Sequence, residues 1–67
     1  MKISERIPHN GNGMPVPPGT LVWIVFRGGY DQLAEGIECD TADCWDWEWF
    51  DIDPERDIIA YYIVTEE

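Results

Sequence analysis

Basic residues are scarce in this chain, which has four lysines and arginines and a single histidine among 67 residues. Acids number fourteen, so the formal net charge is −10 at pH 7. A charge of this size repels phosphate backbones and anionic lipid surfaces, which argues against direct binding to nucleic acid or membranes. The expected partner is a protein that carries a cationic patch.

Cysteine and histidine are too few for a metal centre or a disulfide framework. Cys39 and Cys44 are spaced C-x4-C, and only His9, thirty residues away, is left to join them, whereas a structural zinc ion takes four such ligands. Two cysteines are far fewer than small disulfide-rich secreted domains carry, and they suit the reduced thiols of a cytosolic protein. We expect no metal, no other cofactor and no disulfide.

The features that nucleophilic catalysis, phosphate binding and membrane insertion require are missing as well, and of catalytic groups only paired carboxylates among the fourteen acids are left. His9 has no nucleophile beside it, and Gly28-Gly29 lacks the lysine and hydroxyl residue of a phosphate-binding loop. A chain of this length rarely encloses a pocket of ~300 Å³ or more. The first apolar run, Leu21 to Phe26, is far shorter than the ~20 residues of a membrane helix, and no signal peptide is recognisable. The sequence therefore predicts a soluble, intracellular protein that is not an enzyme.

The acids that are present gather in one stretch, residues 31–57, which holds eleven of them against one base, Arg56. This stretch therefore carries the net charge of the whole chain. Its acids are Asp31, Glu35, Glu38, Asp40, Asp43, Asp46, Glu48, Asp51, Asp53, Glu55 and Asp57. Three tryptophans lie among them, and disordered acidic tails lack such apolar area. The stretch is predicted to be folded.

Two runs of β-branched and aromatic residues, 20–27 and 58–64, predict two strands. Both are apolar on both faces, which places them next to each other at the centre of a sheet. In the second run, simple alternation puts Ile58, Ala60, Tyr62 and Val64 on one face and Ile59, Tyr61 and Ile63 on the other. Residues 1–19, rich in proline and glycine, predict a flexible extended arm with few donors for a sheet. Either this arm and a short helical turn cover the second face, which we favour, or a partner covers it.

The segments between the two strands are less regular. Residues 32–38 predict a weaker strand after a Gly28-Gly29 turn, and Asp40 with Asp43 resembles a capping box before a helical turn. Residues 45–50, the Trp-rich segment, alternate tryptophan with acid, which predicts a strand with Trp45, Trp47 and Trp49 on one face. That face either lines the core, the commoner use of large aromatic residues, or is exposed at an interface with a partner. The fold class predicted for the single domain 1–67 is α+β, mostly β: an antiparallel sheet of three or four strands with one short helix.

The acids at alternate positions from Asp51 to Asp57 invite comparison with a calcium loop. The glycine at the sharp turn and the flanking helices are missing, and Pro54 and Arg56 interrupt the loop. A solvated acidic connection is the better interpretation.

The Trp-rich segment, the acidic connection and the final Asp57-Ile-Ile-Ala-Tyr61 resemble the C-terminal pattern of small proteins of tailed phages, which also open with a proline-rich lead such as Pro15 to Val22. The resemblance implies a small β-rich domain. In that family arginine usually follows the tyrosine, and Tyr62 stands there in this chain. Phages also encode small acidic anti-CRISPR and anti-restriction proteins that resemble DNA electrostatically. By analogy of size, charge and origin, they suggest that this chain inhibits a host defence system.

The leading hypothesis is a phage-encoded inhibitor, a monomer or dimer in the host cytoplasm, that imitates nucleic acid at the basic channel of a host defence nuclease complex. The residues predicted to bind the partner are Asp43, Asp46, Glu48, Asp51, Asp53, Glu55 and Trp47. The alternative is a phage accessory or adaptor protein that assembles through its aromatic face. On that view the tryptophans bind the partner and the acids serve only solubility.

Overall fold

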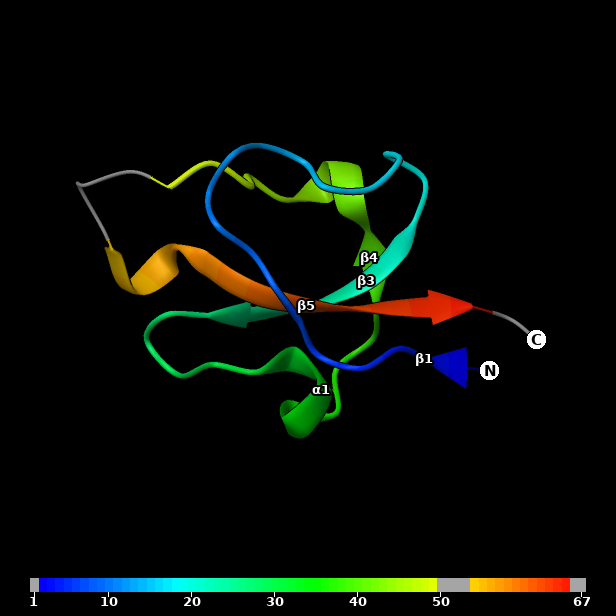
Figure 1. Cartoon of the computed structure of the whole chain (residues 1–67). Coiled ribbons are helices and arrows are strands. Elements are labelled where there is room, and N and C mark those ends of the chain that lie inside the picture. The colour runs from blue at the N-terminus through cyan, green and yellow to red at the C-terminus, as the bar shows by residue number, and fades with distance from the viewer. Residues whose placement is uncertain (1, 50–53, 66–67) are drawn as a thin grey trace.

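A computed structural model describes residues 2–49 and 54–65 (Figure 1). Within them lies a five-stranded antiparallel sheet in the order β1-β5-β3-β4, with β2 also paired to β5. The elements are β1 (Lys2–Ile3), β2 (Ile7–Pro8), β3 (Leu21–Phe26), α1 (Gln32–Glu35), β4 (Asp40–Thr41), the 3₁₀ turns η1 (Ala42–Cys44) and η2 (Pro54–Arg56), and β5 (Ile58–Thr65). The mostly β class with little helix is confirmed, although the sheet has more strands than predicted.

The two long strands, β3 and β5, form the centre of the sheet. They pair antiparallel, with Val22 opposite Ile63 and Ile24 opposite Tyr61. Strand β4 flanks β3 and the two short N-terminal strands flank β5. The prediction that both apolar strands are central and adjacent is confirmed, because a strand that is apolar on both faces needs cover on both.

A register shift changes which residues of β5 reach the core. Between Val25 and Phe26 the pairing moves from Ala60 to Ile58, so Ile59 is an extra residue on β5, as in a β-bulge. The shift brings Ile58 into the main core cluster together with Tyr61. The predicted alternation, with Ile58 and Tyr61 on opposite faces, is therefore wrong at this end of the strand.

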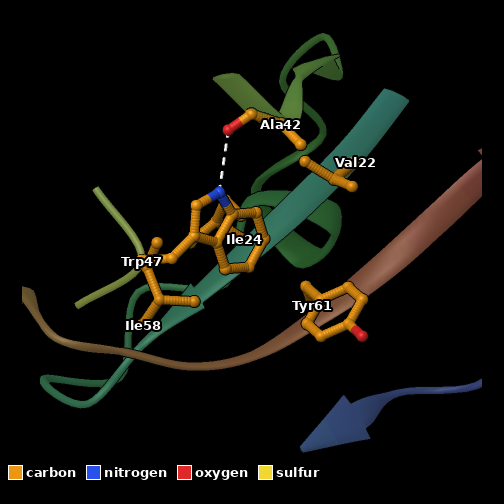
Figure 2. Close-up of a cluster of buried hydrophobic side chains, with 6 residues drawn as sticks. All are labelled: Val22, Ile24, Ala42, Trp47, Ile58 and Tyr61. Atoms are coloured by element: carbon orange, nitrogen blue, oxygen red, sulfur yellow. Dashed lines mark hydrogen bonds between the residues drawn. The ribbon is translucent and has the colours of Figure 1, made fainter. Parts of the chain in front are cut away.

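The main core lies on the face of the sheet under the Trp-rich segment (Figure 2). Val22 and Ile24 of β3 and Ile58 and Tyr61 of β5 form its floor, and the indole of Trp47 lies over them. The Trp47 Nε1–H donates to the Ala42 carbonyl at 2.8 Å, so the buried polar atom is satisfied.

The proline-rich segment before β3 adds strand pairs to the edge of β5. Ile7 pairs with Tyr61, and Lys2 pairs with Thr65. Between these pairs, Ser4 replaces a regular ladder: its amide donates to the Ile63 carbonyl, and its hydroxyl accepts from the Ile63 amide at 2.8 Å. We expected this segment to have few donors for a sheet. It joins one all the same, because an edge strand needs donors along only one side.

The weaker strand predicted for residues 32–38 is wrong, because this segment begins with α1. The Asp31 carboxylate caps the helix by accepting from the amides of Leu33 and Ala34, and Gly36 ends it at φ +72°. The Gln32 side chain accepts from the Ile24 amide at 3.0 Å, so it satisfies an edge group of β3 that β4 does not reach. Helix α1 and the residues after it cover the second face of the sheet.

The predictions for residues 40–50 are also corrected. Instead of a capped helical turn, Asp40–Thr41 is strand β4 on the edge of β3, and the 3₁₀ turn η1 follows without a side-chain cap. Residues 45–49 form no strand. The Asp46 carboxylate accepts from the Glu48 amide at 3.3 Å, and such a local turn withdraws a donor that a strand ladder would need.

Candidate acidic and aromatic interaction site

The exposed acids are distributed over both sides of the sheet. Asp43 lies in η1, and Asp46 and Glu48 lie on the Trp-rich segment that follows it. Glu35 and Glu38 lie on and after α1. Figure 1 shows these two segments on opposite sides of the β3–β5 pair. The acidic stretch that is continuous in sequence therefore presents two separate charged surfaces.

On the side of the Trp-rich segment, four of the predicted site residues, three acids and Trp47, surround a shallow hollow. Its volume is about 240 Å³, and it is lined by Gly13, Met14, Asp43, Trp45, Asp46, Trp47 and Glu48. Gly13 and Met14 come from the loop before β3, so two segments distant in sequence build it. The hollow joins an aromatic and thioether surface to three carboxylates, and we call it the acidic hollow.

Hydrogen bonds within residues 40–44 fix the first part of this site. The Asp40 carboxylate accepts from the Thr41 amide at 2.9 Å and lies 3.4 Å from the Cys44 sulfur. The Thr41 hydroxyl donates to Asp43 Oδ1 at 2.5 Å. Backbone amides of η1 donate to the chain before β3, with Asp43 N bonded to the Pro18 carbonyl at 3.2 Å. The carboxylate of Asp43 is thus held in place at the rim.

Trp47 contributes to the hollow mainly from below. Its side chain is only 3% exposed and packs edge-on against His9 and Tyr61. The prediction that Trp47 contacts a partner is therefore corrected, because its large apolar area is buried in the core. Trp45 is half-buried, packs edge-on against Phe26, and its Nε1 atom is buried with no hydrogen-bond partner among the described residues.

Trp49 lies apart from the hollow and already contacts a cation. The guanidinium carbon of Arg27 lies 4.4 Å from the centre of the Trp49 ring, and Arg27 Nε is 3.7 Å from Asp57 Oδ2. The Trp49 indole donates to the Ile58 carbonyl at 2.7 Å. Gly11 approaches this ring so closely that a Cβ there would lie 2.6 Å from ring atoms. No sequence pattern predicted this stacked cation.

Among the described residues, one predicted site residue, Glu55, does not line the acidic hollow. Glu55 lines a different hollow of about 320 Å³ with Phe26, Gly28, Tyr30 and Arg56. Asp51 and Asp53 lie outside the described residues. The structure thus brings together Asp43, Asp46 and Glu48 and separates them from Glu55.

His9 is a residue whose role sequence reasoning missed. It was expected on a mobile arm, yet it is 8% exposed, and its Nε2 lies 2.6 Å from the Trp47 carbonyl oxygen. Its ring packs edge-on against Trp47, Trp49 and Tyr61. A lone histidine among prolines and glycines carries no periodic signal, so only tertiary contacts reveal that it anchors the Trp-rich segment.

Among residues 2–49 and 54–65, no group of three or more metal-ligating side chains is close enough to hold an ion. Asp57, which the calcium comparison included, is instead buried beside Arg27. None of the helices in the described part of the chain has the length and apolarity needed to cross a membrane.

No protein-family model matches the chain, and no curated protein or solved structure is significantly similar to it. Its function is therefore inferred from geometry and charge.

Proposed function

We propose that this chain is a non-enzymatic inhibitor that occupies the basic nucleic-acid channel of another protein. The class that fits is a phage-encoded inhibitor of a host defence nuclease complex, of the anti-CRISPR or anti-restriction type, acting in the host cytoplasm. The observation that carries the proposal is the concentration of a net charge of −10 in residues 31–57, of which the structure describes 31–49 and 54–57 as part of the fold. Nucleic-acid channels display lysines and arginines for phosphates, and carboxylates on a scaffold compete for them.

The surface of the acidic hollow supports this proposal. Asp46 and Glu48 are exposed, and among the described residues neither forms an ion pair. Unpaired carboxylates retain their charge for a partner and accelerate its approach. Their spacing differs from that of a strand, so the match to phosphates is one of overall charge rather than of a regular row.

The test is competition. We expect the protein to capture a basic nucleic-acid-binding partner from host lysate, to release it at high salt, and to prevent that partner from binding DNA or RNA. Exposed charges are screened over ~8–10 Å at physiological ionic strength, so the affinity should fall steeply with added salt. A ternary complex with nucleic acid in its normal channel would contradict the proposal.

Charge variants locate the surface. Reversing Asp46 and Glu48 to lysine should abolish capture and leave the fold intact, because both side chains are exposed and the one hydrogen bond that the Asp46 carboxylate accepts, from the Glu48 amide at 3.3 Å, is local and exposed. The matched control reverses Glu35 and Glu38 on the other side of the sheet, and we expect a smaller loss. Asp31 is unsuitable as a control, since its carboxylate caps α1 and accepts from the Tyr62 hydroxyl at 3.3 Å.

The adaptor alternative depends on exposed aromatic rings. Trp49 is 38% exposed, which leaves part of its ring available to a partner. This alternative predicts salt-tolerant binding that survives reversal of Asp46 and Glu48 and is lost in Trp49→Ala. Because Trp47 is a core residue, its substitution cannot separate the two functions.

A further inference from the structure

The acidic hollow has the composition of a receptor for a cationic side chain. Trp45 and Met14 supply polarisable apolar surface, and Asp43, Asp46 and Glu48 supply negative charge at its edge. An aromatic face attracts a cation, and a nearby carboxylate adds a charge-assisted hydrogen bond. A purely apolar ligand would partly desolvate the three carboxylates without offsetting their charge.

The size of the hollow limits the occupant to a single side chain. Its volume of about 240 Å³ lies below the ~300–1,000 Å³ of pockets for small-molecule ligands. Clefts of that larger size enclose most of their ligand, whereas this hollow is open to solvent. A long side chain that enters from a partner's surface fits these dimensions.

The chain itself contains an occupied example of the same chemistry. Arg27 lies over the Trp49 ring while its Nε approaches Asp57, which combines one guanidinium, one indole and one carboxylate. The acidic hollow repeats the indole and the carboxylate with Trp45 and its neighbours. In the described part of the chain, no lysine or arginine forms an ion pair with Asp43, Asp46 or Glu48. The intramolecular example favours arginine, since its planar guanidinium stacks on a ring and donates several hydrogen bonds at once.

We propose that the acidic hollow receives one arginine side chain of the basic partner, with the guanidinium against Trp45 and hydrogen-bonded to Asp46 and Glu48. This inference rests on the proposed function and names the group that the partner contributes. It makes the hollow the central contact of a larger charged interface, in the way that buried arginines dominate other interfaces.

The test titrates the ¹⁵N-labelled full chain with N-acetyl-arginine amide and follows the Trp45 indole and Met14 signals by NMR. N-acetyl-citrulline amide, which has nearly the same shape without the charge, is the matched probe. We expect arginine to shift both signals while Trp23, on the other face of the sheet, stays unchanged. Citrulline should shift neither. N-acetyl-lysine amide should bind more weakly than arginine.

Variants then assign the charges. Asp46→Asn and Glu48→Gln should each weaken arginine binding by about two- to fivefold, the ratio expected for a partly exposed ion pair. Glu35→Gln and Glu38→Gln, which remove the same charge elsewhere, should have no effect. Equal shifts with citrulline, or equal losses in both pairs of variants, would overturn the inference.

The two proposals fail separately. If the partner is captured in a salt-dependent manner while arginine amide leaves the hollow unchanged, the arginine site is wrong and the inhibitor function stands. If arginine occupies the hollow but the protein does not compete with nucleic acid on any basic partner, the inhibitor function is wrong and the site stands.

Discussion

The two faces of the β3–β5 pair are covered by segments that differ in how far along the sequence their contacts reach. On one face, α1 and its continuation lie close in sequence to β3: Gln32 accepts from Ile24 eight residues away, and Trp23 donates to the Ile37 carbonyl fourteen residues away. On the other face, His9 holds Trp47 across 38 residues. The acidic hollow lies on the face that is organised by long-range contacts, so its shape depends on the N-terminal segment.

The largest effect should come from Trp47→Ala, which removes the ring that covers the core on the long-range face. The variant leaves a cavity and removes the indole hydrogen bond to the Ala42 carbonyl, and we expect a loss of about 3–5 kcal/mol in the free energy of unfolding. Small domains have ~5–15 kcal/mol in total, so the protein would be close to unfolding. Urea denaturation measures the loss. A melting temperature within two degrees or so of the parent would show that Trp47 is not a core residue.

The register shift in β5 is tested by comparing Ile58→Ala with Ile59→Ala. Ile58 is fully buried in the core, whereas Ile59 is half-buried and lies outside the main cluster. We expect a loss of about 2–5 kcal/mol for Ile58 and a clearly smaller one for Ile59. The same denaturation experiment serves for both. A larger loss at Ile59 would restore the simple alternation that the sequence predicts.

His9→Ala should loosen one face and spare the other. The variant leaves the buried Trp47 carbonyl without its partner, which costs about 1–3 kcal/mol. Hydrogen exchange of the Trp47 and Trp49 indoles should accelerate, while the amides of α1 keep their protection. Asn10→Ala, an exposed neighbour, is the control. If hydrogen exchange accelerates equally on both faces, the Trp-rich segment and α1 open together as a single cooperative unit.

The smallest effect at neutral pH concerns Tyr61. Burial raises the pKa of its phenol above the usual 10.0. The folded state then binds the phenol proton more tightly than the unfolded state does, so stability is unaffected below pH ~10 and falls as the pH rises beyond that value. Chemical denaturation at increasing alkaline pH measures this fall. Tyr61→Phe should reduce it. An identical alkaline fall in the variant would assign the effect to other groups.

Local sequence patterns predicted those parts of the fold that depend on the residues of a single segment. Runs of β-branched residues placed β3 and β5 correctly. The Trp45 to Trp49 alternation had the period of a strand, but the turn made by Asp46 and the inward bonds of Trp47 replaced the ladder. Of the residues predicted for the site, Asp43, Asp46 and Glu48 line one hollow together with the buried Trp47, and Glu55 lies elsewhere. Their role in binding stays a prediction.

The sequence alone determined the sign and location of the charge and the two strands that form the centre of the sheet, because both depend on composition and local period. Only the tertiary structure decided which carboxylates share a surface. That choice depends on the burial of His9 beside Trp47 and on the loop of Gly13 and Met14, which lines the acidic hollow with the Trp-rich segment. Each of these joins residues that are distant in the chain, and their energy comes from packing, which has no local sequence signal.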